Sequence, residues 1–331
     1  MSKAELDEDH ETTPNRLSPS VIATISGLIS AVGYTAANIC LRSVVHVDPV
    51  WVSCVKAFPT LIAVMPFLFF GKKNGENWFP NRRVFTVILA TGLIGQLGGN
   101  VAFQWALSQI GLAIVVPLTL GTLIAVSAIL GRICLGDSVS PRMIVSGFIL
   151  LVAICILSSE AQTIQSDSSV SPTPNPLHAE LNADFRTTAL GVSAACFCGV
   201  AYCALSIGIR FATNHGTQRE SVLGLVSLTG VVSLGLANLA VNGVEPIMTS
   251  TFSDYVAMLL AGIFNYIAFY ALVIALREAS VYFVNALNAS QTAMAALAGV
   301  FLFSEPFTVT AGLGIALTMV GLLFMRKGKR N

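Results

Sequence analysis

Ten long apolar runs constrain the fold of this chain more than any other feature of its sequence. A helix needs about 20 consecutive apolar residues to cross a hydrocarbon core of about 30 Å. The runs are continuous and lack the two-residue alternation of a membrane barrel, which favours helices. We therefore predict an all-α integral membrane protein with ten transmembrane helices, at 20–41, 49–70, 84–107, 111–134, 141–159, 187–211, 221–241, 252–275, 280–303 and 307–325.

The composition supports a chain that lives in a lipid bilayer. Only 11% of the residues are charged and 54% are apolar, whereas about 25% of the residues in a soluble domain are charged. The formal net charge is only +1, which argues against a basic surface that binds nucleic acid. The lipid bilayer is the partner that this composition indicates.

The basic residues predict the orientation of the chain, because cytoplasmic loops are enriched in Lys and Arg. With the N-terminus inside, all but three of the 18 Lys and Arg residues fall on the cytoplasmic side. We expect a multi-pass protein of the cell (plasma or inner) membrane with both termini cytoplasmic. Residues 1–19 read as a disordered cytoplasmic tail, 160–186 as a Ser- and Pro-rich extracytoplasmic linker, and 326–331 as a basic cytoplasmic tail.

The linker divides the runs into two sets of five that resemble each other. Asp137 and Glu305 follow the fourth run of each set and are 168 residues apart, as are Ser140 and Thr308. Because each set has an odd number of spans, the second copy enters the membrane from the opposite side. The sequence thus predicts two inverted five-helix repeats, at 20–159 and 187–325, an arrangement that suits alternation between inward-open and outward-open states.

The same landmarks carry a resemblance to a known family. Ala106-Leu107, Pro117 and Gly136-Asp137 in the first repeat, and Ala275-Leu276, Glu305, Thr308, Gly314 and Gly321 in the second, follow one order. Over residues 20–325 the chain resembles the EamA-type members of the drug/metabolite transporter superfamily, which have ten helices in two repeats. It departs from their pattern with Asp137 in place of Glu, Asn285 in place of Pro and Lys56 in place of Arg.

Polar residues recur at helical spacing within several apolar runs, and polar side chains in lipid tend to face the bundle interior. The resemblance implies that the first, third, fourth, sixth, eighth and ninth spans line a central cavity, and the polar stripes fall on those spans. Some of these side chains could instead bond only to neighbouring helices. The predicted substrate-binding residues are Tyr34, Asn38, Lys56, Gln96, Asn100, Gln104, Tyr202, Tyr266, Tyr270, Asn285 and Asn288, with Ser30, Thr119, Thr122, Cys198, Ser206, Asn265, Gln291 and Thr292 on the same stripes.

Lys56 is the only charged residue well inside a run, and two interpretations of it stay open. It either faces the cavity and attracts an anionic group, or extends along the helix to the outer interface. No Asp, Glu or His lies deep within a run, so we expect facilitated exchange or a coupling route other than a carboxylate that carries protons. Gly95 and Gly99 form a Gly-xxx-Gly pair, which indicates close helix packing.

The leading hypothesis is a secondary transporter, an exporter or exchanger of small organic metabolites that works by alternating access. The alternatives are a nucleotide-sugar or sugar-phosphate antiporter, and a non-transporting structural or sensory membrane protein. We expect no enzyme, because the four histidines are scattered outside the runs. We also expect no cofactor and no metal, because the cysteines read as packing residues. The partners are a small-molecule solute and lipid, and a homodimer is compatible with the sequence.

Overall fold

The structure is a computed structural model, and it describes residues 18–70, 80–137, 139–168, 179–303 and 308–325. Within these ranges the regular elements are helices, as predicted. Glu305 and most residues of the two predicted tails lie outside the described residues. The elements are α1 (Pro19–Arg42), α2 (Pro49–Phe70), α3 (Arg82–Leu93), η2 (Ile94–Asn100), α4 (Val101–Ile110), α5 (Leu112–Leu135), α6 (Pro141–Ser168), α7 (Ala179–Asn214), α8 (Arg219–Val241), α9 (Glu245–Thr249), α10 (Phe252–Glu278), α11 (Val281–Asn288), α12 (Ser290–Phe303) and α13 (Val309–Met325).

Seven stretches of the described chain are long and apolar enough to cross a membrane. One of them is Arg82–Ile110, in which α3, η2 and α4 follow one another without a gap. Two shorter apolar helices, Pro141–Ile156 and Gly312–Phe324, fall where two further spans were predicted. The span predicted at 280–303 is divided into α11 and α12. The multi-pass helical fold is therefore confirmed, while the count of ten crossings stays a prediction.

The segment predicted as a linker, 160–186, contains helix at both of its ends. Helix α6 continues to Ser168 and α7 begins at Ala179, so both ends of that segment are helical. Both ends are rich in polar residues, and so a search for apolar runs does not detect these helical turns. Residues 169–178 lie outside the described part of the chain.

Helix ends follow from local side-chain chemistry. Asn81 precedes α3 and its Oδ1 accepts a hydrogen bond from the backbone N–H of Val84 at 2.9 Å. Thr251 and Asp254 form a capping box at the start of α10, which satisfies backbone N–H groups that have no partner within the helix. Helix α5 ends at Leu135 and is followed by Gly136, whose φ of +67° is a conformation that suits glycine.

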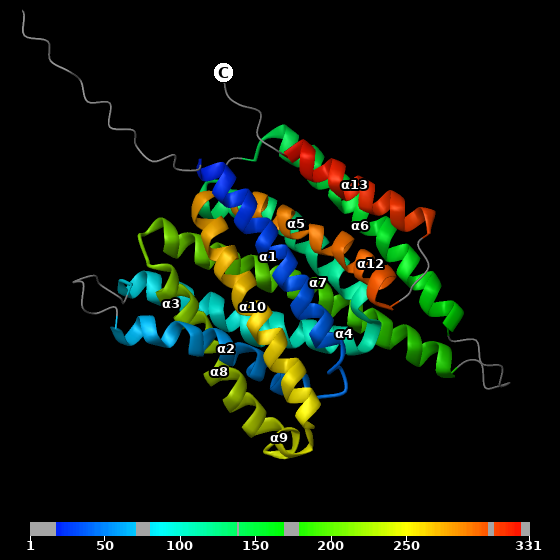
Figure 1. Cartoon of the computed structure of the whole chain (residues 1–331), viewed down its shortest axis with the longest axis horizontal. Coiled ribbons are helices and arrows are strands. Elements are labelled where there is room, and N and C mark those ends of the chain that lie inside the picture. The colour runs from blue at the N-terminus through cyan, green and yellow to red at the C-terminus, as the bar shows by residue number, and fades with distance from the viewer. Residues whose placement is uncertain (1–17, 71–79, 138, 169–178, 304–307, 326–331) are drawn as a thin grey trace, which may run out of the picture.

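The main packing partners of most helices come from the other repeat (Figure 1). The first helix of each repeat, α1 or α7, packs against the third span of the other repeat: α1 packs along α10, and α7 packs along α3, η2 and α4. Each also contacts the fourth span of the other repeat, so that α7 contacts α5 and α1 contacts α11 and α12. Helix α2 pairs with α8, and α6 pairs with α13 at one side of the bundle. Exchanging the two repeats reproduces this set of contacts. The packing is therefore that of two equivalent halves that interleave.

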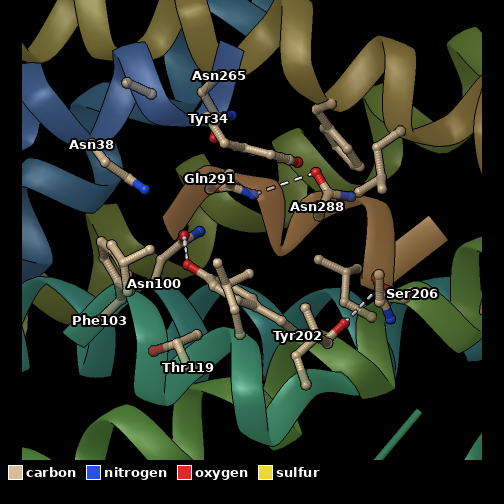
Figure 2. A pocket seen from close by; sticks show the side chains of 18 of the residues that line it. Tyr34, Asn38, Asn100, Phe103, Thr119, Tyr202, Ser206, Asn265, Asn288 and Gln291 are labelled. Carbon is tan, nitrogen blue, oxygen red and sulfur yellow. Dashed lines mark hydrogen bonds between the residues drawn. The ribbon is translucent and has the colours of Figure 1, made fainter. Parts of the chain in front are cut away.

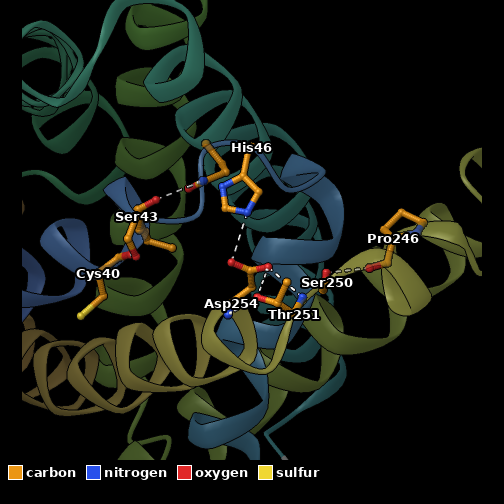
Figure 3. Close-up of polar contacts among 9 residues, drawn as sticks. Cys40, Ser43, His46, Pro246, Ser250, Thr251 and Asp254 are labelled. Carbon is orange, nitrogen blue, oxygen red and sulfur yellow. Dashed lines mark hydrogen bonds and ion pairs between the residues drawn. The ribbon is translucent and has the colours of Figure 1, made fainter.

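A cluster of polar contacts ties the repeats together at one end of the bundle (Figure 3). His46 lies between α1 and α2, and its Nε2 is 3.1 Å from Oδ1 of Asp254 in the first turn of α10. The other carboxylate oxygen of Asp254 accepts the backbone N–H of Thr251 at 2.8 Å. The same carboxylate thus caps a helix of the second repeat and contacts a loop of the first.

Candidate functional site

A central cavity of about 120 Å³ lies between the two repeats (Figure 2). Helices α1, α2, α4 and α5 and the segment η2 contribute its lining from the first repeat, and α7, α8, α10, α11 and α12 contribute from the second. The polar lining residues are Tyr34, Asn38, Lys56, Gln96, Asn100, Thr119, Tyr202, Ser206, Asn265, Asn285, Asn288 and Gln291. Amides and hydroxyls from both halves therefore meet around one space.

Eight of the eleven predicted site residues line this cavity. They are Tyr34, Asn38, Lys56, Gln96, Asn100, Tyr202, Asn285 and Asn288. Thr119, Ser206, Asn265 and Gln291, which lie on the same predicted stripes, line it too. The i, i+4 spacing of polar residues in otherwise apolar runs was the signal that located them.

Tyr266 and Tyr270 are not among the lining residues. On α10 the cavity is lined by Asn265, Phe269 and Leu272, and a residue one position further along an α-helix is rotated by about 100°. The two tyrosines therefore face a different direction. Their rings contact each other with centroids 6.2 Å apart, and they pack against an apolar cluster of the core.

Gln104, the last member of the stripe on the third span, also lies away from the cavity. Its side chain is 2% exposed, and its Nε2 is 3.5 Å from the carbonyl oxygen of Leu41. Gln96 and Asn100 lie in η2, whereas Gln104 lies in the regular helix α4. A π-helical segment has a different number of residues per turn. Residues that follow η2 at α-helical spacing therefore face another direction than Gln96 and Asn100.

Asn100 is the centre of a hydrogen-bonded cluster in the cavity wall. Its Oδ1 accepts a hydrogen bond from Nζ of Lys56 at 2.8 Å and another from the hydroxyl of Tyr202 at 2.7 Å. Its Nδ2 donates to Oε1 of Gln96 at 2.5 Å, and Nε2 of Gln96 donates to the carbonyl of Val226 at 3.3 Å. This cluster joins η2 to α2, α7 and α8, and it holds the ammonium of Lys56 against Asn100 in the cavity wall.

The π-helix η2 lets this cluster form, because it is built around glycines that allow close approach. A Cβ at Gly95 would lie 2.8 Å from Cδ2 of Leu205, and a Cβ at Gly99 would lie 2.7 Å from Cε1 of Tyr202. The packing role predicted for this Gly-xxx-Gly pair is thereby confirmed. π-Helical turns inside α-helices occur often at functional sites, and here the turn carries both Gln96 and Asn100.

A second group of amides lines the cavity from the break between α11 and α12. Oδ1 of Asn288 accepts a hydrogen bond from Nε2 of Gln291 at 3.3 Å (Figure 2). It also accepts one from the hydroxyl of Ser30 at 3.2 Å. Asn285 is 1% exposed, and its Nδ2 has no hydrogen-bond partner among the residues that the structure describes. A buried donor without a partner carries a desolvation cost of about 1–3 kcal/mol. A ligand in the cavity that accepts from Asn285 would remove this cost.

Several lining positions are equivalent between the repeats. Tyr34 and Tyr202 are 168 residues apart, the same separation as Asp137 and Glu305. The same separation relates four further pairs of lining residues, Ala37 with Leu205, Asn38 with Ser206, Leu120 with Asn288 and Leu123 with Gln291. The charge is not duplicated, because the described lining residues of the second repeat are uncharged. The cavity is thus symmetric in position but asymmetric in chemistry.

Lys56 is 6% exposed and lines the cavity. This burial argues against extension to the outer interface, because a lysine extended to the membrane interface would keep its ammonium in water. The attraction of an anionic group stays a prediction. No other lysine and no Asp, Glu, Arg or His is among the described residues that line the cavity. The electrostatic character of the site is therefore set by one buried cation surrounded by neutral dipoles.

About half of the lining was not predicted from the sequence. These residues are Ala37, Leu41, Phe103, Val116, Leu120, Leu123, Leu205, Val226, Phe269 and Leu272. An apolar side chain that faces a cavity is indistinguishable in sequence from one that faces lipid or another helix. The repeat offset was the available signal, because it relates Leu120 and Leu123 to two polar lining positions.

The fold and the cavity define a multi-pass membrane protein with two equivalent halves around a polar central site. The model of the EamA-like transporter family matches residues 19–159 and 189–327, one match in each repeat. The chain belongs to the EamA-like transporter family, whose members are transporters of small molecules rather than enzymes. This membership confirms the resemblance seen in the sequence.

A comparison with solved structures agrees on the fold. One crystal structure aligns with 91% of this chain and 97% of its own chain, with a TM-score of 0.68 and 17% sequence identity. At that identity the likeness concerns the fold alone. No individual curated protein matches the sequence significantly.

Proposed function

We propose that this protein is a secondary transporter that moves a small organic metabolite across the plasma or inner membrane, as an exporter or exchanger. The observation that carries the proposal is the central cavity, which repeat-equivalent positions of both halves line. Binding sites of transporters built from inverted repeats lie near the membrane midplane, at the interface between the repeats. The cavity of this chain has that relation to its two repeats.

Alternating access is the mechanism that the packing supports best. In this proposal the chain crosses the membrane ten times, five times in each repeat, with the repeats in opposite orientation. Because exchanging the repeats reproduces the interhelical contacts, exchanging their conformations produces a state of similar energy that opens to the other side. The contact between His46 and Asp254 joins the repeats at one end, where it would have to open in one of the two states.

The cavity favours a small metabolite over a nucleotide sugar or a sugar phosphate. An engineered apolar cavity of about 150 Å³ holds one benzene molecule, so 120 Å³ suits a solute of comparable size. A phosphate group carries about two negative charges near neutral pH. Among the described lining residues, Lys56 is the one cation that could face it. We therefore favour exchange or facilitated flux of a compact solute.

Counterflow in proteoliposomes tests the proposal. Vesicles that contain the purified full chain and an unlabelled solute should accumulate the labelled form of that solute, whereas protein-free vesicles should not. A solute panel is first narrowed by thermal stabilisation of the detergent-purified protein, because a bound ligand raises the apparent stability. Failure of every stabilising solute to show counterflow would refute transport.

A labelling experiment tests the topology. Single cysteines are introduced near each end of the chain, in a variant that lacks the native cysteines, and are labelled with an impermeant reagent in intact cells. Both termini should be protected until the membrane is permeabilised. Labelling of one terminus from outside would refute both the even number of crossings and the inverted relation of the repeats.

A further inference from the structure

The ammonium of Lys56 is incompletely satisfied within the described part of the protein. A lysine ammonium has three N–H donors, and the hydrogen bond found for it goes to Oδ1 of Asn100 at 2.8 Å. That oxygen is shared with the hydroxyl of Tyr202. The two ion pairs among the described residues join His46 to Asp254 and Arg277 to Glu278. Neither of them involves Lys56.

A buried cation without a counter-charge is costly, because neutral dipoles only partly replace the water it has lost. The other lining residues add no negative charge to the described cavity wall. A solute that brings an anionic group to Nζ of Lys56 would complete its hydrogen bonds and neutralise its charge in a single step. The described cavity wall therefore lacks an anionic partner for Lys56, and such a solute would provide it.

We propose that the transported solute carries a carboxylate and that Lys56 binds it inside the cavity. This proposal rests on the proposed function and names the substrate class of the same site. A carboxylate matches the site because it carries one negative charge, equal and opposite to that of Lys56. The phosphate of a sugar phosphate would leave about one charge unpaired in the cavity.

The other lining residues indicate the chemistry of the rest of the solute. The Nδ2 of Asn285 is buried and finds no hydrogen-bond partner within the described ranges, so it offers a donor group from the second repeat. Phe103, Leu120 and Phe269 provide apolar surface in the same cavity. The solute is thus a compact monocarboxylate with an apolar body, and Asn285 offers a hydrogen bond to an acceptor atom of that solute, a carboxylate oxygen included. A simple organic acid and an amino acid share this chemistry, and the experiment below separates them.

Matched acid and amide pairs test the proposal on the detergent-purified full chain. The probes are butyrate with butyramide, phenylacetate with phenylacetamide, and valine with valinamide, each titrated while the apparent Tm is measured. We expect at least one acid to raise the Tm with an affinity about tenfold or more above that of its amide, equal to about 1.4 kcal/mol. Stabilisation by valine but not by the simple acids identifies a zwitterion as the ligand.

Two variants assign the effect to Lys56. Lys56→Gln should abolish the preference for the acid. Arg142→Gln removes the same charge from an exposed position at the start of α6 and should keep the preference. If Lys56→Gln does not fold, the comparison of acid with amide on the native chain still decides, because that comparison needs no variant.

The outcomes separate this proposal from transport itself. If no acid binds better than its amide, the carboxylate class is overturned, and counterflow of a neutral solute would leave the transport function standing. If an acid binds but shows no counterflow in vesicles, the carboxylate site stands and transport falls. If Lys56→Gln retains the full preference for the acid, the assignment to Lys56 is wrong.

Discussion

Replacing Gly99 by alanine tests the contact on which the polar wall of the cavity depends. The added Cβ would lie 2.7 Å from Cε1 and 2.8 Å from Cδ1 of Tyr202. Carbon atoms prefer separations of about 3.5–4.0 Å, so the tyrosine ring would have to move by about 1 Å. Its hydroxyl is 2.7 Å from Oδ1 of Asn100, and a displacement of that size breaks the hydrogen bond.

The expected cost follows from three contributions. Overpacking costs about 1–3 kcal/mol, and the lost hydrogen bond adds about 0.5–1.5 kcal/mol. Replacing glycine by alanine within a helix stabilises the helix by about 1 kcal/mol, which offsets part of this cost. The free energy of unfolding should therefore fall by about 0.5–3.5 kcal/mol. Ligand binding should weaken as well, because Tyr202 lines the cavity.

Gly92→Ala is the matched control, since it removes a glycine from the same span. A Cβ at Gly92 would lie 3.7 Å from Cβ of Thr229, an ordinary contact. This variant should be as stable as the native chain or more stable. Thermal unfolding of the two purified variants in one detergent compares them directly. Equal midpoints for Gly99→Ala and Gly92→Ala would refute the tight packing of Tyr202 on η2.

Three further substitutions test contacts that hold the bundle together, each by thermal unfolding. Asp137→Asn should lower stability by about 1 kcal/mol, because Oδ2 of Asp137 accepts the backbone N–H of Val281 at 3.1 Å and so caps α11 of the other repeat; an unchanged midpoint would exclude this role. Ser146→Ala should lower stability by about 0.5–1.5 kcal/mol through loss of the 2.6 Å hydrogen bond to the carbonyl of Gly321. The same midpoint as the native chain would mean that this contact between α6 and α13 does not form in solution. Thr251→Ala should cost about 1 kcal/mol by removing the capping box of α10, and native-like stability would contradict that cap.

The sequence was sufficient to predict the helical membrane fold, because apolar length and continuity leave little else that a lipid-embedded chain can form. It was also sufficient for the polar half of the cavity. Tyr34 and Asn38, or Gln96 and Asn100, stand out against apolar neighbours at a spacing that places them on one face.

The rest depended on information that lies outside local spacing. On α10, polar Asn265 and aromatic Tyr266 are adjacent, and only the packing of neighbouring helices selects the face that meets the cavity. The side chains that pack against Gly95 and Gly99 in η2, Leu205 and Tyr202, come from α7, which is distant in the sequence. Apolar lining such as Phe103 carries no contrast with its surroundings, and so no pattern in the sequence reveals it.

The interleaved packing of the halves has a consequence for how the protein is made. Helix α1 ends at Arg42 and its main partner α10 begins at Phe252, so about 210 residues separate them. At about 5–20 residues per second, the ribosome needs roughly 10–40 s to deliver that partner. Throughout this interval the early helices are in the bilayer without their final neighbours, and the first half of the chain must wait for the second before either acquires its native structure.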